Sequence, residues 1–313
     1  MNAILDPAKF KDPVITAKGE TRASVHWDHL KTLWLNTGSL CNIECANCYI
    51  LSSPTADHFV YLKDIDVIPY LDEIDAMGLG AVEIGMTGGE PCMNPHFGKI
   101  CRLVLERGHR LLVLTNAMKP LMRPRVQKTL VELKSEFPDK MTFRVSLDHF
   151  TAKGHDEERG IGSFDIALVG LNWLSEHGFD LHIAGRAMFS ESEASARQGY
   201  GTLIKEHGWD IDAEDPAALM LFPEMDAQVD VPEITTECWG ILSIDPKTMM
   251  CANSRMVVKR KGAEAPAVLS CTLLWDDPQF EMGQTLKESL TPVQLNHPHC
   301  AKFCVLGGAS CSA

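Results

Sequence analysis

The segment CNIECANCY, residues 41–49, comes just after an apolar run, Thr32–Asn36, that is typical of a β-strand. Its cysteines, Cys41, Cys45 and Cys48, are spaced so that one loop can point three thiolates at one point. A [4Fe–4S] cluster normally takes four cysteine thiolates, so three ligands leave one iron open. An open coordination position is typical of a metal site that carries out chemistry, as in catalytic zinc sites. A zinc knuckle and a chance cluster of cysteines are the alternatives that this spacing leaves open.

Strand-like and helix-like segments alternate through the first three quarters of the chain. The helical segments carry apolar residues three or four positions apart, as at Ile65, Ile68, Leu71 and Ile74. Such alternation implies parallel strands joined by right-handed crossovers. We therefore expect an α/β fold, a partial (β/α)6 barrel of TIM-like character. The expected strands are Thr32–Asn36, Ala81–Met86, Arg110–Leu114, Thr142–Ser146, Leu181–Ala187 and Ala218–Phe222. The expected helices are Ile65–Met77, Pro95–Glu106, Arg123–Glu136, Phe164–His177 and Glu191–Glu206.

The alternation stops between Glu224 and Glu237, where a cysteine-rich tail begins. Within the tail, the segment from Cys238 to Cys251 reads as strand, turn and strand, and a helix-like segment follows near Leu286–Leu290. The sequence therefore predicts three parts. These are an N-terminal arm at residues 1–30, the barrel at residues 31–230, and a small cysteine-rich domain of hairpin and helix at residues 231–313.

The composition is that of an ordinary globular chain. A net charge of −13 over 313 residues argues against a protein that binds nucleic acid by neutralising phosphates. The apolar runs are too short to cross a membrane, and residues 1–20 lack the pattern of a secretion signal, so we expect a cytoplasmic protein. In the reducing cytosol, the clustering of eleven cysteines favours metal or cluster ligands over disulfides. Cys92 and Cys101 stand apart and are expected to be buried core thiols.

Glycines and polar residues follow the strands at the end where barrels of this type carry their sites. Gly88, Gly89 and Glu90 follow the second strand, and Asn116 follows the third. Two glycines allow a strand end to approach a ligand closely, and a carboxylate can accept hydrogen bonds from an ammonium group. An ordinary turn before a helix is the alternative for this triplet, and its position after a strand favours a ligand site.

The fourth and fifth strands contribute charged candidates. Ser146 and Asp148 alternate along the chain, so both side chains can face the barrel interior. A helix cap is the alternative for Asp148. Arg186 can bind a carboxylate through two parallel hydrogen bonds, with a structural ion pair as its alternative. His155, in the segment that follows, is expected in a surface loop.

The order of these motifs along the chain resembles that of radical S-adenosylmethionine (radical SAM) enzymes. Cys41, Cys45 and Cys48, with Tyr49 behind them, match the cluster-binding loop of that family. The resemblance implies that SAM chelates the open iron of a [4Fe–4S] cluster. An electron from the reduced cluster, supplied by an external flavodoxin- or ferredoxin-like reductant, would then break the sulfonium C–S bond. The resulting 5′-deoxyadenosyl radical would abstract a hydrogen atom from the substrate.

The resemblance also implies a set of residues around SAM. The glycine–glycine–glutamate motif would hold the methionine amino group, and small polar residues of the fourth strand would bond the ribose. The family often has glycine after the asparagine of the third strand, whereas this chain has Ala117. The residues expected to bind the cofactor are Gly88, Gly89, Glu90, Asn116, Ser146, Asp148, Arg186 and Tyr49.

The tail cysteines resemble the SPASM/twitch extensions of the same family, whose cysteines hold auxiliary iron–sulfur clusters. The full SPASM pattern has more cysteines than the six that this tail offers. One auxiliary cluster is therefore expected, with a second as the alternative, and a zinc site as a further alternative. The candidate ligands are Cys238, Cys251, Cys300 and Cys304 for one cluster, with Cys271 and Cys311 as replacements or as part of a second.

These observations favour a radical SAM oxidoreductase or modifying enzyme that acts on a peptide or protein by hydrogen abstraction. A small-molecule substrate, such as a sugar, a tetrapyrrole or another metabolite, is the alternative within this class. A non-catalytic iron–sulfur electron carrier or a zinc scaffold is the alternative from another class. Neither nucleic acid nor a membrane is expected as a partner.

Overall fold

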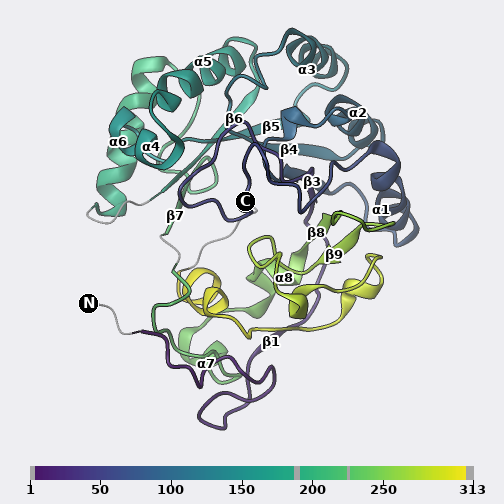
Figure 1. The fold of residues 1–313 in the computed structure, drawn as a ribbon, viewed down its shortest axis with the longest axis vertical. Coiled ribbons are helices and arrows are strands. Elements are labelled where there is room, and N and C mark those ends of the chain that lie inside the picture. The colour runs from purple at the N-terminus through teal and green to yellow at the C-terminus, as the bar shows by residue number, and fades with distance from the viewer. Residues whose placement is uncertain (1–3, 187–190, 224–225, 308–313) are drawn as a thin grey trace.

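The computed structural model describes residues 4–186, 191–223 and 226–307, and one curved sheet organises them (Figure 1). Its strand order is β7-β6-β5-β4-β3-β2-β8-β9, and every neighbouring pair from β7 to β8 is parallel. The sheet is not closed, because β7 and β9 are its two edges. The strands are β2 (Thr32–Asn36), β3 (Glu83–Thr87), β4 (Arg110–Thr115), β5 (Met141–Ser146), β6 (Asp180–Arg186), β7 (Leu219–Phe222), β8 (Ser254–Val258) and β9 (Ala267–Leu269).

Helices follow the strands and cover the outer face of the sheet, as Figure 1 shows. The predicted α/β fold with a mostly parallel sheet is confirmed, and the six expected strands and five expected helices all form. Ala187, the last residue of one expected strand, lies outside the described residues. The helices are α1 (Asp64–Ala76), α2 (Phe97–Glu106), α3 (Pro124–Glu136), α4 (Ala152–Arg159), α5 (Ser163–Glu176), α6 (Glu193–His207), α7 (Cys238–Leu242) and α8 (Met250–Asn253).

Helix α1 shows how the periodicity produces the fold and where it misleads. Its buried side chains are Val67, Tyr70, Leu71 and Ile74, which recur at three- and four-residue spacing and pack on the sheet. Ile65, which the sequence assigned to the same apolar face, is 64% exposed. The predicted helix therefore forms, but its buried face is rotated about the helix axis from the face that the sequence assigned.

The predicted hairpin between Cys238 and Cys251 is wrong. This segment forms α7, a 3₁₀ turn at Pro246–Thr248, and α8. Local chemistry explains the difference: the Asp245 side chain accepts a hydrogen bond from the backbone of Lys247, which starts the turn at the following proline. The strand that follows, β8, then pairs in parallel with β2 and extends the main sheet.

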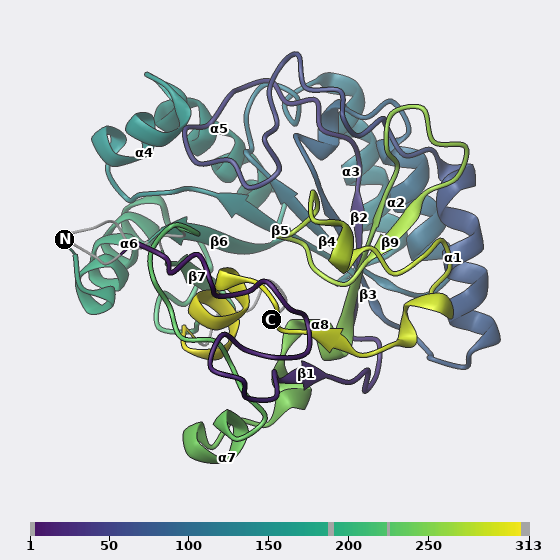
Figure 2. The same cartoon turned by 60° about the horizontal axis from the view of Figure 1, so that its bottom comes forward.

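The N-terminal arm packs on the tail. Strand β1 (Ser24–Val25) pairs antiparallel with β10 (Val293–Gln294), and Figure 2 shows the two running side by side below the sheet. Near this pair, the buried Arg22 guanidinium donates to the Glu233 carboxylate. Whether residues 231–313 are a domain of their own stays a prediction. No helix in the described ranges is long and apolar enough to cross a membrane.

Candidate functional site

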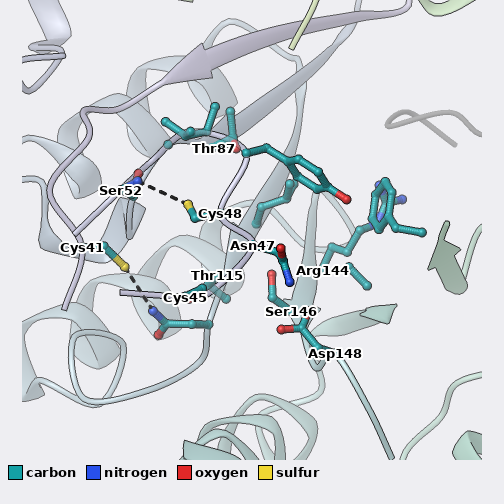
Figure 3. Close-up of a pocket in the computed structure, with 18 of the residues that line it drawn as sticks. Cys41, Cys45, Asn47, Cys48, Ser52, Thr87, Thr115, Arg144, Ser146 and Asp148 are labelled. Atoms are coloured by element: carbon teal, nitrogen blue, oxygen red, sulfur yellow. Dashed lines mark hydrogen bonds between the residues drawn. The ribbon is translucent and has the colours of Figure 1, made fainter. Parts of the chain in front are cut away.

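A cavity of about 190 Å³ lies where the parallel strands end (Figure 3). Cys41, Cys45 and Cys48 all line it, so the loop after β2 presents its three thiols to one space. Because the strands are parallel, the segments that follow them meet at this edge of the sheet. Of the residues predicted to bind the cofactor, the structure places in the lining Tyr49, Gly88, Gly89, Asn116, Ser146, Asp148 and Arg186.

The two glycines after β3 bring that segment against the cysteine loop. The backbone N–H of Gly89 donates to the carbonyl of Gly38 at 2.8 Å. A Cβ atom at Gly89 would lie 2.1 Å from the carbonyl oxygen of Leu40, and one at Gly88 would lie 2.5 Å from that of Gly38. The sequence predicted that these glycines allow approach to a ligand. The structure shows that they are first needed for close approach to the chain's own cysteine loop.

Glu90 is a buried carboxylate that binds its own chain. It accepts hydrogen bonds from the Thr115 hydroxyl at 2.9 Å, the Asn116 backbone at 2.9 Å and the Cys92 backbone at 3.1 Å. Burial raises its pKa, and these donors act in the opposite direction. Glu90 does not line the cavity, unlike the glycines before it. The structure therefore places the predicted ammonium-binding carboxylate behind the cavity wall, where it joins the end of β3 to the end of β4.

Asn116 continues this link to the cysteine loop. Its side-chain nitrogen donates to Asn42 at 3.0 Å and lies 3.8 Å from the Cys41 sulfur. The next residue, Ala117, has a φ of 53° and is fully buried, so alanine adopts the left-handed conformation that glycine adopts more easily. The departure from the family's glycine therefore does not prevent the turn.

The sulfur atoms of Cys41 and Cys48 lie near N–H donors, and Cys41 is buried. The backbone N–H of Ser52 donates to the Cys48 sulfur at 3.3 Å, as Figure 3 shows. Burial, the nearby Glu90 carboxylate and the other thiols raise the pKa of Cys41 to about 12. A thiol in such a place ionises readily only beside a cation, and a metal centre supplies one. Three thiols that line one cavity, two of them beside N–H donors, thus fit the iron–sulfur cluster implied by the sequence.

A group of charged side chains lines another part of the cavity. The Asp148 carboxylate accepts from Arg159 at 2.6 and 3.1 Å, and the Arg186 Nε lies 3.4 Å from the same carboxylate. Arg186 also donates to the Asn47 carbonyl at 2.7 Å. Arg186 thus forms an ion pair with Asp148, which is the alternative role that the sequence left open for it. The N-cap of the following helix is Thr151, so the helix-cap alternative for Asp148 is wrong.

Sequence reasoning missed Arg159, and it misplaced His155. Arg159 lines the cavity from the last turn of α4. His155 is not in a surface loop: it is fully buried, and its Nδ1 accepts from the Asp148 backbone at 3.2 Å. Burial and the Arg159 charge lower the pKa of His155 to about 4, so its ring is neutral near pH 7.

Apolar side chains line a further part of the cavity, and Arg144 of β5, the strand partner of Leu114, lines it as well. Trp34 of β2, Leu114 of β4, Phe222 of β7 and Leu273 belong to one apolar contact cluster and all line the cavity. Leu273 comes from the cysteine-rich tail, and no sequence motif pointed to it. The tail also holds the cysteine loop directly, because the indole N–H of Trp275 donates to the Tyr49 carbonyl at 2.7 Å.

Four tail cysteines line a second, smaller cavity of about 30 Å³. They are Cys251, Cys271, Cys300 and Cys304. Burial and the neighbouring Cys271 raise the pKa of Cys251 to about 12. Cys238, a member of the first expected set, does not line this cavity, and its sulfur lies 3.4 Å from the Thr235 backbone nitrogen. Cys311 lies outside the described residues. The structure thus brings Cys271 to the place expected for Cys238.

Within residues 4–186, 191–223 and 226–307, no three His, Cys, Asp or Glu side chains stand close enough to hold one metal ion. The predicted core thiols behave as expected, since Cys92 and Cys101 are both buried. The described cysteines are all free thiols.

Known proteins resemble this chain in sequence and in fold. The family model of the radical SAM superfamily matches residues 35–192, about half of the chain. The antilisterial bacteriocin subtilosin biosynthesis protein AlbA of Bacillus subtilis is 32% identical over 46% of this chain and 30% of its own length. The mycofactocin maturase MftC of Mycobacterium tuberculosis is 31% identical over 44% of this chain and 33% of its own length. The matched segment thus spans about a third of these curated relatives.

Two solved structures of SuiB from Streptococcus suis share the fold. The one bound to S-adenosylmethionine matches with a TM-score of 0.58 at 14% identity, over 82% of this chain and 63% of SuiB. The one bound to the precursor peptide SuiA matches with a TM-score of 0.60 at 13% identity, over 90% of this chain and 67% of SuiB. At such low identity the likeness concerns the fold alone.

Proposed function

Because the chain belongs to the radical SAM superfamily of enzymes, we propose that Cys41, Cys45 and Cys48 hold a [4Fe–4S] cluster beside a SAM-binding cavity. The observation that carries this proposal is that all three thiols line one cavity at the carboxyl edge of the parallel sheet. When bound, the cluster and SAM supply reductive cleavage of the sulfonium bond and a 5′-deoxyadenosyl radical. The chain's own residues hold both groups, orient them and exclude water.

We assign the polar lining of the cavity to SAM. Gly88 and Gly89 offer backbone groups next to the cysteine loop, and Ser146 offers a hydroxyl at the end of β5. The cationic side is the place for the SAM carboxylate, because guanidinium groups bind carboxylates well. Arg159 gives Nε and Nη2 to Asp148, and among the described residues its Nη1 has no partner. Arg159 therefore joins Arg186 as a candidate for this contact.

Glu90 acts through its neighbours. Its carboxylate holds the backbone of Asn116, and the Asn116 side chain donates toward Cys41 and Asn42. We propose that Glu90 is a positioning residue for the cysteine loop and for the strand ends that line the cavity. Its burial and its hydrogen bonds to Thr115 and Asn116 support this role.

A peptide or protein is the proposed substrate, with a small molecule as the alternative. The relatives named above support it: MftC is a maturase, and SuiB has been solved with a precursor peptide. An external one-electron donor of the flavodoxin or ferredoxin type is proposed as the reductant. A small acidic carrier of that kind would need a route to the cluster loop, and Cys45 and Cys48 are only partly buried.

The second cavity supports an auxiliary iron–sulfur cluster of the SPASM/twitch type, with Cys271 replacing Cys238. Four thiols line one space, which matches the usual ligand number of a [4Fe–4S] cluster. A tetrahedral zinc ion holds its thiolates at about 2.3 Å and so draws them close together. A zinc ion bound by the same four thiols is the alternative, and metal analysis distinguishes the two.

The binding of SAM to an open iron can be tested by electron paramagnetic resonance (EPR). The protein is loaded anaerobically with iron and sulfide and reduced with dithionite, and spectra are recorded with and without SAM. We expect a signal whose g-values change when SAM is added, because a new ligand alters the iron environment. A Cys45→Ala variant should lack the SAM-sensitive signal. An unchanged wild-type spectrum would favour the non-catalytic electron carrier.

A further inference from the structure

Trp275 of the tail supports the cysteine loop from both of its ends. Its indole N–H donates at 2.7 Å to the carbonyl of Tyr49, the residue after the last cysteine of the loop. Its ring packs edge-on against Phe59, with ring centroids 5.3 Å apart. Phe59 in turn holds Ser39, which lies two residues before the first cysteine, because their two hydrogen bonds are each 3.1 Å long. Trp275 therefore contacts the segments that enter and leave the loop.

Trp275 is itself fixed by residues outside the loop. Its ring stacks on His58, with ring centroids 4.6 Å apart and planes 18° from parallel. The Arg260 guanidinium donates to the Trp275 carbonyl at 2.9 Å and to the Glu281 carboxylate at 2.9 Å. Ring stacking and a charge-assisted hydrogen bond both restrict the orientation of the indole. Its N–H donor is therefore held in place for the Tyr49 carbonyl.

The chain just before Trp275 belongs to the second cavity. Cys271 and Leu273 both line that cavity, and the Leu273 backbone N–H donates to the Cys271 sulfur at 3.4 Å. Leu273 lines the first cavity as well. One apolar cluster packs against Cys48, Cys304 and Trp275, so it touches a thiol of each cavity. Packed side chains and hydrogen bonds of this kind can carry an energetic effect from one site to another.

The Tyr49 side chain connects this support to the cavity assigned to SAM. Tyr49 lines that cavity, and the central carbon of the Arg186 guanidinium lies 5.3 Å from the centre of its ring. Arg186 is a candidate for the SAM carboxylate. A shift of the Tyr49 backbone would therefore disturb both the end of the cysteine loop and a cation at the cavity wall.

We propose that Trp275 is a positioning residue for the SAM-binding loop, through which occupation of the second cavity strengthens SAM binding in the first. A group held by the thiols of the second cavity fixes Cys271 and the chain up to Trp275. The indole then holds Tyr49 at a smaller entropic cost, so that less of the SAM-binding energy is spent on ordering the loop. This inference rests on the proposed function, because it places SAM in the first cavity and a cysteine-bound group in the second.

Titration of SAM into the reconstituted, dithionite-reduced protein tests the positioning role. The dissociation constant is read from the SAM-dependent change in the EPR spectrum. Trp275→Phe keeps an aromatic ring and removes the N–H donor. We expect its dissociation constant to be about two- to tenfold higher than that of the wild type, as the loss of one hydrogen bond predicts. At saturating SAM its spectrum should equal that of the wild type, because the cluster and its ligands are unchanged.

Trp209→Phe is the matched control. The Trp209 indole N–H also donates one hydrogen bond, to the Asn172 side chain at 2.9 Å, and Trp209 lines neither cavity. This variant should bind SAM as the wild type does. An unchanged dissociation constant in Trp275→Phe, an equal rise in Trp209→Phe, or an altered spectrum of Trp275→Phe at saturating SAM would overturn the positioning role.

A double-mutant cycle tests the link to the second cavity. Cys271→Ala removes a thiol that lines the second cavity and not the first, and it should also raise the dissociation constant of SAM. The double variant Cys271→Ala/Trp275→Phe should bind SAM no more weakly than the weaker of the two single variants, because both changes interrupt the same connection. Effects that multiply, or wild-type SAM binding by Cys271→Ala, would overturn the link.

The wild-type titration separates this inference from the proposed function. If the wild-type spectrum does not respond to SAM, the proposed function fails. If it responds and Trp275→Phe binds SAM as tightly as the wild type, only the role of Trp275 fails.

Discussion

Gly89 has room for a hydrogen atom and for nothing larger, because the Leu40 carbonyl would lie 2.1 Å from a Cβ atom. This contact decides how closely the end of β3 approaches the cysteine loop. The sequence attributed the glycine pair to the approach of a ligand, which stays a prediction, and the structure adds its contact with the chain's own cysteine loop. A sequence motif shows that close approach is needed, and only the fold shows what approaches.

Gly89→Ala should therefore displace the cysteine loop. We expect the variant to unfold at a lower denaturant concentration and to retain less iron after desalting than the wild type. Gly240→Ala is the matched control, since no atom lies within 4 Å of a Cβ atom at that position. It should keep wild-type iron content. Equal iron retention in the two variants would show that the contact at Gly89 does not hold the loop.

His155 gives the chain a sensitivity to acid. Its folded-state pKa of about 4 lies below the ordinary value of 6.5. Between pH 6.5 and 4, the unfolded chain therefore takes up a proton that the folded protein does not. Stability is therefore lost as the pH falls from about 6.5 toward 4. Between pH 7.5 and 5.5, this one group should cost on the order of 1–2 kcal/mol.

The test is chemical unfolding of the wild type and of His155→Gln at both pH values. Glutamine can still accept from the Asp148 backbone and does not titrate. The variant should lose less free energy of unfolding between pH 7.5 and 5.5 than the wild type. If both lose the same amount, burial does not hold the ring neutral.

Elements with a clear period could be predicted from the sequence, and short polar ones could not. The six strands and five helices of the barrel form as expected, since buried parallel strands and amphipathic helices carry strong periodic signals. The segment from Cys238 to Cys251 has no such period, and the 3₁₀ turn between its two short helices depends on a local cap by Asp245. Arg159 was missed for another reason: its partner Asp148 lies on a different element, and only tertiary packing brings them together.

The ends of β3 and β4 are joined by Glu90, and this link can be tested. Glu90→Gln replaces an acceptor oxygen by an NH₂ group that faces N–H and O–H donors. We expect a loss in the free energy of unfolding on the order of 1–3 kcal/mol, together with weaker SAM binding. Glu106→Gln, on an exposed face of α2, should leave both nearly unchanged. Similar unfolding curves for the two variants would contradict a joining role for Glu90.

At the scale of the whole molecule, the tail forms part of both cavities. Cys271 lines the second cavity, and Leu273 lines both. The Trp275 indole N–H donates to the carbonyl of Tyr49, the residue after Cys48. Five consecutive residues thus connect the two groups of cysteines. The sequence predicted a second cysteine site in the tail, but the choice of ligands depended on a hairpin that does not form.

Iron content distinguishes the ligand sets. With two [4Fe–4S] clusters, the reconstituted wild type should hold about eight iron atoms per chain. Cys271→Ala should reduce this to about four, because the second cavity loses a ligand. Cys238→Ala is the matched control and should stay near eight, since Cys238 does not line that cavity. The reverse pattern would restore the set first expected from the sequence, and stoichiometric zinc would exclude an auxiliary cluster.

The central claim is that the three-cysteine loop serves SAM cleavage. The most direct measurement is the amount of 5′-deoxyadenosine formed when the reconstituted protein is incubated with dithionite and SAM. We predict that the wild type forms it, that Cys41→Ala does not, and that Cys101→Ala, which changes a buried core thiol, still does. A wild-type protein that forms none, or a Cys41→Ala variant that forms as much as the wild type, would contradict the account.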